Sequence, residues 1–299
     1  MTGAAAFSEA ERGAVAAALA EIACAAGEIL RRYHRGPCPH ALKPDGSPSS
    51  AADLEAEHLI LGALAGRFPG LAVVAEETRH DAPASACFFL VDPLDGTRDF
   101  LAGTPDYSVN IALIAGDRPV AAALAAPGIG RVWWAGAAAV EAAVTGGRPG
   151  PGRAVRARAA PTAGLVALGS RRHGDPETAT CLAALPVAET RAVGSALKFG
   201  LIAAGEADVY VRCGPTMEWD TAAGDHLVAA AGGCVVAPGG GPIRYGRFAE
   251  GYRNGPFAAL GDPGLAGRLA LPKRRPASAP AGVLAGGAVR AAESPPAKP

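Results

Sequence analysis

The sequence has no excess charge of either sign, because 28 Lys and Arg residues balance 28 Asp and Glu residues. A protein without net charge has no broad electrostatic attraction to nucleic acid or to an anionic membrane surface, so nucleic acid is not an expected partner. Any phosphate binding must therefore depend on a few residues at one site. Lysine itself is scarce, and the chain contains only Lys43, Lys198, Lys273 and Lys298.

The sequence also lacks the usual signals for export or membrane insertion. The first nine residues contain no basic residue, and acidic residues interrupt the Ala-rich run that follows, so a signal peptide is not expected. We identify no apolar run that is long enough to span a bilayer. These absences predict a cytoplasmic protein without a membrane span.

The six cysteines are scattered, without C-x-x-C spacing, and most of them lie inside apolar segments. This pattern predicts buried, reduced thiols in a reducing compartment. His34, Cys38 and His40 lie close together near the N-terminus, but no fourth ligand follows at a spacing that is typical of zinc sites. A zinc site is therefore not expected.

With 299 residues and 49% hydrophobic content, the chain can bury a large core in one domain or two. Apolar residues at helical spacing predict one helix over residues 9–33 and a second over residues 51–68. Ser50 and Asp53 stand in the S-x-x-D relation at the start of the second helix. Asp53 is therefore either a capping-box acid or an acid of the functional site, and the two roles are compatible.

The most informative stretch follows a short apolar run, residues 87–91, which is typical of a buried strand. Asp92 and Asp95 lie directly after it, separated by Pro93 and Leu94 and followed by Gly96. Two such carboxylates can converge past the strand end and suit Mg²⁺, which prefers oxygen ligands. The alternative is an ordinary turn, because Asp-Pro and Asp-Gly pairs often bond local amides.

Other acids favour the metal hypothesis. Glu76 ends an apolar run over residues 71–75, and Asp220 lies where a further helix begins. Four carboxylates from three segments would repel one another without cations. Two or three Mg²⁺ ions would neutralise them and form the clamp that is used in phosphoryl displacement.

The residues after Asp95 could serve a phosphate ester at such a site. The Gly96 and Thr97 amides stand at the predicted start of a helical turn, where amides bind phosphate oxygens. The Thr97 hydroxyl could pass a proton from water towards Asp53.

The chain divides into two units by its pattern. Apolar runs over residues 107–114, 120–124 and 131–134 predict an antiparallel meander, which makes an α+β unit with the two helices over residues 1–152. Alternating strands and helices predict an α/β unit over residues 153–272. Residues 273–299 are rich in Pro, Ala and Gly and predict a disordered tail.

These motifs resemble, in order and separation, the two signatures of the inositol monophosphatase superfamily of Mg²⁺-dependent, lithium-sensitive phosphatases. Within it the chain looks most like the bacterial 3'(2'),5'-bisphosphate nucleotidases, which remove the 3'-phosphate of adenosine 3',5'-bisphosphate formed during sulfate assimilation. The resemblance covers residues 10–262. Its segments are residues 45–53, 76–77, 92–97, 109–114, 194–199, 214–216 and 219–224.

The resemblance implies a layered α-β-α-β-α fold with the site between two subdomains, and it allows a homodimer. The implied metal ligands are Glu76, Asp92, Asp95, Asp220 and the Leu94 carbonyl. Asp53, Glu76 and Thr97 would be catalytic, and substrate would contact Glu76, Gly96, Thr97, Ser195, Lys198 and Asp220. Ser50 departs from the threonine that is usual in the family but keeps the hydroxyl.

Three residues or segments remain ambiguous. Lys198 is either a phosphate-binding cation or a solvated helix residue. Residues 171–173, Arg-Arg-His, either meet a second phosphate or the adenine or form an ordinary charged loop. Trp219 is expected to pack against the core rather than stack on substrate.

Two other functions remain open. One is another phosphatase of the same superfamily, acting on inositol phosphate or fructose 1,6-bisphosphate. The other is a non-catalytic metal-dependent binding module.

Overall fold

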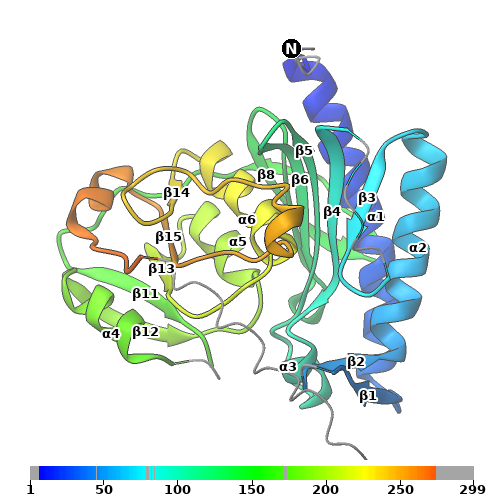
Figure 1. The fold of residues 1–299 in the computed structure, drawn as a ribbon, viewed down its shortest axis with the longest axis horizontal. Coiled ribbons are helices and arrows are strands. Elements are labelled where there is room, and N and C mark those ends of the chain that lie inside the picture. The colour runs from blue at the N-terminus through cyan, green and yellow to red at the C-terminus, as the bar shows by residue number, and fades with distance from the viewer. Residues whose placement is uncertain are drawn as a thin grey trace, which may run out of the picture.

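The computed structural model describes residues 7–44, 46–78, 81, 83, 85–171 and 174–273. Elements are stacked in five layers (Figure 1). Helices α1 (Glu9–His34) and α2 (Ala51–Arg67) form the first layer, α5 (Leu197–Ala203) and α6 (Glu218–Ala230) lie between two sheets, and α4 (Pro176–Ala183) lies outermost. The predicted α-β-α-β-α layering is therefore confirmed. Apart from Lys273, the predicted disordered tail lies outside the described residues.

The first sheet has eight strands in the order β10-β8-β7-β6-β5-β4-β3, with β9 paired to β8. Strands β4 to β8 form an antiparallel meander, of which β5 to β7 were predicted, whereas β3 pairs in parallel with β4. This parallel pairing brings the ends of β3 and β4 to one edge of the sheet. The bounds are β3 (Ala72–Ala75), β4 (Cys87–Asp95), β5 (Ser108–Ala115), β6 (Arg118–Ala126), β7 (Arg131–Ala135), β8 (Ala139–Thr145), β9 (Arg148–Pro149) and β10 (Arg153–Ala154).

Strand β10 still pairs with β8, one residue beyond the predicted boundary at residue 152. The division of the chain into two units at that residue stays a prediction.

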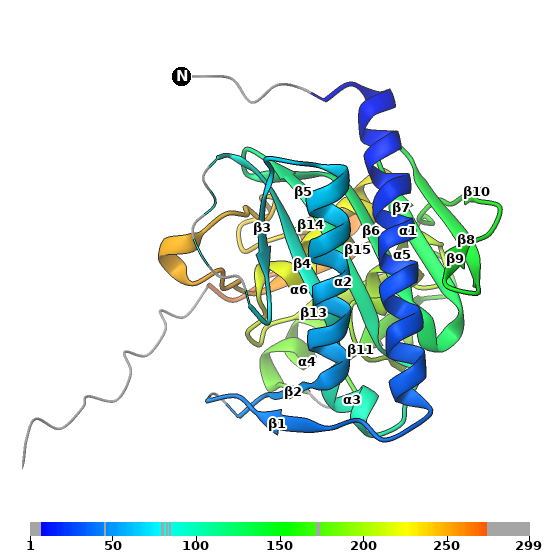
Figure 2. The same ribbon diagram turned by 90° about the vertical axis from the view of Figure 1, so that its right-hand side faces the viewer.

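Helices α1 and α2 cover the outer face of the first sheet side by side (Figure 2). Each begins with a capping box, formed by Ser8 with Glu11 and by Ser50 with Asp53, which satisfies amides that the first turn leaves free. By length and composition alone, α1 could cross a membrane, which the search for long apolar runs did not anticipate. Its apolar face is instead buried against β6 and β7, as in the core helix of a globular domain.

The second sheet has five strands in the order β12-β11-β13-β15-β14. It begins with parallel pairs and ends with antiparallel ones, so it is mixed. The bounds are β11 (Leu165–Gly169), β12 (Val187–Ala192), β13 (Val209–Arg212), β14 (Cys234–Val236) and β15 (Phe257–Leu260). Smaller elements are β1 (His40–Leu42), β2 (Pro48–Ser50), α3 (Thr97–Leu101), η1 (Pro127–Ile129), η2 (Phe248–Glu250) and η3 (Pro263–Arg268).

The middle helices approach their neighbours closely through two glycines. A Cβ on Gly224 of α6 would lie 2.2 Å from Cγ of Phe199 in α5, and a Cβ on Gly200 would lie 2.8 Å from the Trp133 ring in β7. Because cores are packed at crystal-like density, these contacts fix the distance of α6 from the first sheet. The N-terminal end of α6, which carries Asp220, is thereby held near the end of β4.

This packing predicts a difference between two glycine substitutions in helices. Gly224→Ala should lower the free energy of unfolding by about 1–3 kcal/mol, because the added methyl group collides with the Phe199 ring. Gly62→Ala in α2 is the matched control, since no atom lies within 4 Å of its Cβ position, and it should raise stability by about 0.4–1 kcal/mol. Urea unfolding measures both, and equal effects would contradict the packing argument.

Candidate active site

Three acidic side chains converge where the two sheets face each other. Glu76 follows β3, Asp92 lies in β4, and Asp220 lies in the first turn of α6. Each offers a carboxylate oxygen, and these oxygens all lie within 4.8 Å of one another. This is the only such group of His, Cys, Asp and Glu ligands in the described ranges. The predicted meeting of Asp220 with the β4 turn is present.

An irregularity in β4 aims its two aspartates differently. The register with β5 shifts between Asp92 and Asp95, so that Asp92 stands opposite Asn110 and Asp95 opposite Ser108. The Leu94 amide donates to Asp92 Oδ1 at 3.0 Å, so the local turn bonding of the alternative hypothesis coexists with the acid cluster. Such bulges commonly re-aim side chains at functional sites.

Asp95 lies beside the cluster rather than within it. Its Oδ2 accepts a hydrogen bond from the Ala196 amide, which joins the first sheet to the segment before α5. Its charge still raises the pKa values of Asp92 and Asp220, so it lies within electrostatic reach of both. The expected four acids are therefore present as a group of three with one neighbour.

The negative charges of the clustered acids are poorly compensated by positive charge. Burial, followed by the charges of neighbouring carboxylates, raises the pKa values of Asp92 and Asp220 well above their usual range. Burial also raises the pKa of Glu76 to about 7, although Lys43 opposes the shift. A bound cation would remove this penalty, because it neutralises charges that water cannot reach.

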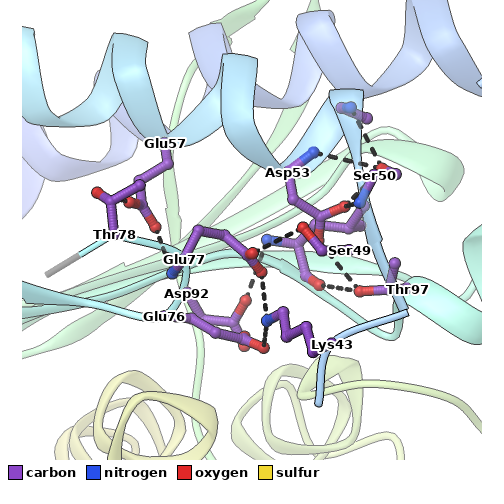
Figure 3. A network of polar contacts seen from close by, with 12 residues as sticks. Lys43, Ser49, Ser50, Asp53, Glu57, Glu76, Glu77, Thr78, Asp92 and Thr97 are labelled. Carbon is purple, nitrogen blue, oxygen red and sulfur yellow. Dashed lines mark hydrogen bonds and ion pairs between the residues drawn. The ribbon is translucent and has the colours of Figure 1, made fainter. Parts of the chain in front are cut away.

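Lys43 forms ion pairs with two acids at this site (Figure 3). Its Nζ donates to Glu76 Oε1 at 2.8 Å and to Glu77 Oε1 at 2.7 Å. Glu77 is held in turn by Ser49, and its own amide donates to Glu57. Sequence reasoning missed these contacts, although the scarcity of lysine in the chain was a signal that Lys43 has a specific task.

Asp53 forms the capping box of α2 and also contacts Thr97 (Figure 3). Its Oδ2 accepts from the amide and hydroxyl of Ser50 in the capping box, and its Oδ1 accepts from the Thr97 hydroxyl at 3.1 Å. The same hydroxyl lies 3.1 Å from the Leu94 carbonyl oxygen. Burial raises the pKa of Asp53 to about 6. The predicted Thr97–Asp53 pair is therefore formed.

Two further buried groups indicate that the site suits a hydrated ion. Ser108 Oγ and both polar atoms of the Asn110 amide are buried without a hydrogen-bond partner in the described part of the chain. Both residues stand opposite the β4 aspartates in the sheet. Carboxylates and uncharged oxygen donors beside orphaned polar groups fit a hard divalent cation that retains water.

A cavity of about 310 Å³ lies at the acids and is lined by side chains of both charges. Glu76, Asp95 and Asp220 line it, and so do Lys198 and Arg212, whose charges oppose the rise that burial causes in the pKa of Asp95. The remaining expected substrate contacts, Gly96, Thr97 and Ser195, also line it. Sequence reasoning did not identify Arg212, because a single arginine at a strand end carries no motif.

Lys198 is not a solvated helix residue. Its side chain is buried, and Nζ donates to the carbonyl oxygens of Val193 at 3.0 Å and Ser195 at 2.6 Å. Burial lowers the pKa of Lys198 to about 8, against the charge of Asp95, which raises it. The lysine thus shapes the turn that precedes α5 and supplies positive charge to the cavity.

The turn that follows the β4 aspartates packs tightly against the turn before α5. Gly96 has a φ of +90°, and a Cβ there would lie 3.0 Å from the Asp106 carbonyl oxygen and 3.2 Å from Ser195 Cβ. Ser195 itself has a φ of +50°, which is unusual for a residue with a side chain. A glycine at residue 96 therefore allows the two turns to meet over the cavity.

Two of the ambiguous side chains take structural partners. Arg171 forms an ion pair with Asp106 at 2.6 Å, and Asp106 also accepts from the Gly194 amide at 3.0 Å. Arg171 therefore buttresses the Gly194 turn, while residues 172 and 173 lie outside the described residues. Trp219 is buried and packs against Tyr252, as expected.

The raised pKa values predict how the metal-free protein responds to pH. The pKa of an unfolded Asp or Glu is about 4. An acid whose pKa is higher in the folded protein gives its full stabilisation below about pH 4, and it loses that stabilisation as the pH rises through the folded pKa. Since the Glu76 pKa is about 7 and that of Asp53 about 6, stability without divalent cations should fall between about pH 4 and pH 7.

Asp220→Asn should flatten this slope and raise the melting temperature of the metal-free protein at neutral pH, because one buried charge is gone. Thermal unfolding in chelator across this pH range measures both effects. A melting temperature that collapses in Asp220→Asn would show that the carboxylate is needed for folding.

Comparison with known proteins assigns the chain to a family. The model of the inositol monophosphatase family matches residues 11–292. The chain is 37% identical over 224 residues to the 3'(2'),5'-bisphosphate nucleotidase CysQ of Salmonella typhimurium, covering 72% of this chain and 87% of that protein. It is 35% identical to CysQ of Escherichia coli K12 over 233 residues, covering 75% and 91%.

Solved structures support the same family assignment. The crystal structure of CysQ from Bacteroides thetaiotaomicron superposes with a TM-score of 0.72 at 31% identity, covering 83% of this chain and 97% of that one. An inositol monophosphatase of Thermotoga maritima, at 21% identity, has the same fold with a TM-score of 0.66. The chain belongs to the inositol monophosphatase family of phosphatases.

Proposed function

We propose that the protein is a Mg²⁺-dependent 3'(2'),5'-bisphosphate nucleotidase that removes the 3'-phosphate of adenosine 3',5'-bisphosphate and yields AMP. The observation that carries the proposal is the acid cluster of Glu76, Asp92 and Asp220 at a cavity that Lys198 and Arg212 also line. The similarity to CysQ proteins named as bisphosphate nucleotidases supports the choice of substrate. A cytoplasmic role in sulfate assimilation is part of the same proposal.

The acids are suited to hold two or three Mg²⁺ ions. Glu76, Asp92 and Asp220 offer converging oxygens, and Asp95 and the Leu94 carbonyl lie beside them. When bound, Mg²⁺ supplies charge neutralisation for the phosphate and lowers the pKa of water. The buried carboxylates and orphaned polar groups of the site favour ions over an empty cluster.

Thr97 and Asp53 are suited to take a proton from the attacking water. The Thr97 hydroxyl donates to Asp53 Oδ1, so its oxygen lone pairs remain free to accept a hydrogen bond from water. Asp53, with a pKa of about 6, is deprotonated for the most part at neutral pH yet basic enough to share the proton. Glu76 lines the same cavity as Thr97 and is the second candidate base.

The basic residues of the cavity support a substrate that carries more than one phosphate. Lys198 and Arg212 line the same cavity as the acids, so a second phosphate has positive charge to meet there. Ser195 and Gly96 also line the cavity and would contact the substrate. Inositol monophosphate or fructose 1,6-bisphosphate hydrolysis is the alternative within the family.

Phosphate release from a panel of substrates tests this proposal. Adenosine 3',5'-bisphosphate should be hydrolysed with a higher kcat/KM than inositol 1-phosphate, only with Mg²⁺ present, and with inhibition by lithium. Asp92→Ala should lower kcat by at least about 10³-fold, because it removes transition-state charge stabilisation. Faster turnover of inositol 1-phosphate would favour the alternative, and unchanged turnover in Asp92→Ala would refute the assigned site.

The role of Thr97 can be tested with two variants of different chemistry. Thr97→Val keeps the shape but loses the hydroxyl, and it should lower kcat by about 10²–10⁴-fold with little change in KM. Thr97→Ser keeps the hydroxyl and should retain most activity. Nearly full activity in Thr97→Val, or an equal loss in Thr97→Ser, would contradict a role that depends on the hydroxyl alone.

A further inference from the structure

A second polar cavity, of about 220 Å³, lies at the C-terminal end of α1, where that helix meets the start of β5 and the η1 turn. No residue that lines it also lines the active-site cavity. The lining residues are Arg31, His34, Arg35, Tyr107, Pro127, Gly128, Gly130 and Val144. Three of these eight residues, Arg31, His34 and Arg35, have basic side chains, which is unusual in a chain with zero net charge.

Tyr107 gives this cavity a buried donor without an acceptor. Its side chain is fully buried, and its hydroxyl has no hydrogen-bond partner in the part of the chain that the structure describes. Burial raises the pKa of Tyr107 to about 12, while the charges of Arg31 and Arg35 oppose the shift, which places both guanidinium groups within electrostatic reach of the phenol. The hydroxyl therefore keeps its hydrogen at neutral pH.

The position of the Tyr107 hydroxyl is fixed by its ring neighbours. The ring packs edge-on against Phe100 at 4.9 Å and is tilted against the His34 ring at 5.0 Å between centroids. His34 Nε2 lies 3.1 Å from the Thr104 carbonyl oxygen, which orients that ring in turn. A hydroxyl donor held in this way is already ordered, so binding of a ligand that accepts its hydrogen bond costs little conformational entropy.

The two arginines of the cavity are poorly compensated. Arg31 reaches Glu28 only at 3.5 Å, between Nη1 and Oε2, and Arg35 has no ion pair in the described ranges. In contrast, Arg32 on the same turn pairs with Glu55 at 2.6 Å. Glu28 is an acid whose charge acts on Tyr107, and its side chain is 41% exposed.

We infer that this cavity binds a small tetrahedral oxyanion, phosphate or sulfate, between the guanidinium groups of Arg31 and Arg35 and the hydroxyl of Tyr107. Guanidinium groups present donors in a fork that matches such anions, and a neutral hydroxyl adds a hydrogen bond. A cavity of 220 Å³ holds an inorganic anion with several waters of about 30 Å³ each, but it is smaller than the range of about 300–1,000 Å³ that is usual for larger ligands. The inference does not depend on the proposed function.

Calorimetric titration with inorganic phosphate tests it in the full-length chain. The protein is kept in chelator, so that no divalent cation holds phosphate at the active site, and chloride at equal ionic strength is the control titrant. Saturable binding at one site is expected. The double variant Arg31→Gln/Arg35→Gln should weaken it by about 100-fold and Tyr107→Phe by about tenfold, since each removes hydrogen bonds to a charged ligand.

Arg32→Gln is the matched control, because it removes a neighbouring positive charge that is already paired with Glu55. It should bind phosphate as the unaltered chain does. The inference is overturned if phosphate gives no more heat than chloride, or if the double variant and Arg32→Gln bind equally. If the double variant does not fold, Tyr107→Phe decides the question alone, because it deletes one oxygen atom and keeps the packed ring.

Discussion

Mutual repulsion between buried carboxylates is the constraint on which the rest of this structure depends. Glu76, Asp92 and Asp220 place oxygens within 4.8 Å of one another, with Asp92 fully buried and the other two partly buried. Such an arrangement is unfavourable unless a cation compensates it. Lys43 forms ion pairs with Glu76 and Glu77, and the charge of Arg212 opposes the raised pKa of Asp220, but Asp92 has no ion pair within the described part of the chain. The cost is tolerable because packing elsewhere holds the three segments together.

That packing is supplied by both sheets and by the helices between them. Parallel pairing of β3 with β4 sets Glu76 beside Asp92, and the close approach of Gly224 to Phe199 and of Gly200 to Trp133 sets α6 against the first sheet. Asp95 adds a direct link, because its carboxylate accepts from the Ala196 amide. The cavity is therefore assembled from elements that are far apart in the chain but rigidly placed.

Much of this could be predicted from local pattern. The two N-terminal helices, the antiparallel meander and the strands on either side of residues 92–95 follow from periodicity, because each element buries one face and local spacing records which face that is. The Thr97–Asp53 pair and the Ser50 capping box were also predicted. Lys43, Arg212 and the Arg171–Asp106 ion pair were not, because they depend on contacts between segments that no spacing encodes.

By itself, the sequence determined the type of each main element and the identity of the acids that meet, since apolar periodicity and the order of Asp, Pro and Gly act over a few residues. Only the tertiary structure decided that Asp95 stands beside the cluster rather than inside it, that Lys198 is buried, and that Tyr107 is left with an unpartnered hydroxyl next to two arginines. The physical reason is that burial and electrostatic surroundings are set by neighbours in space, and those neighbours come from remote parts of the chain.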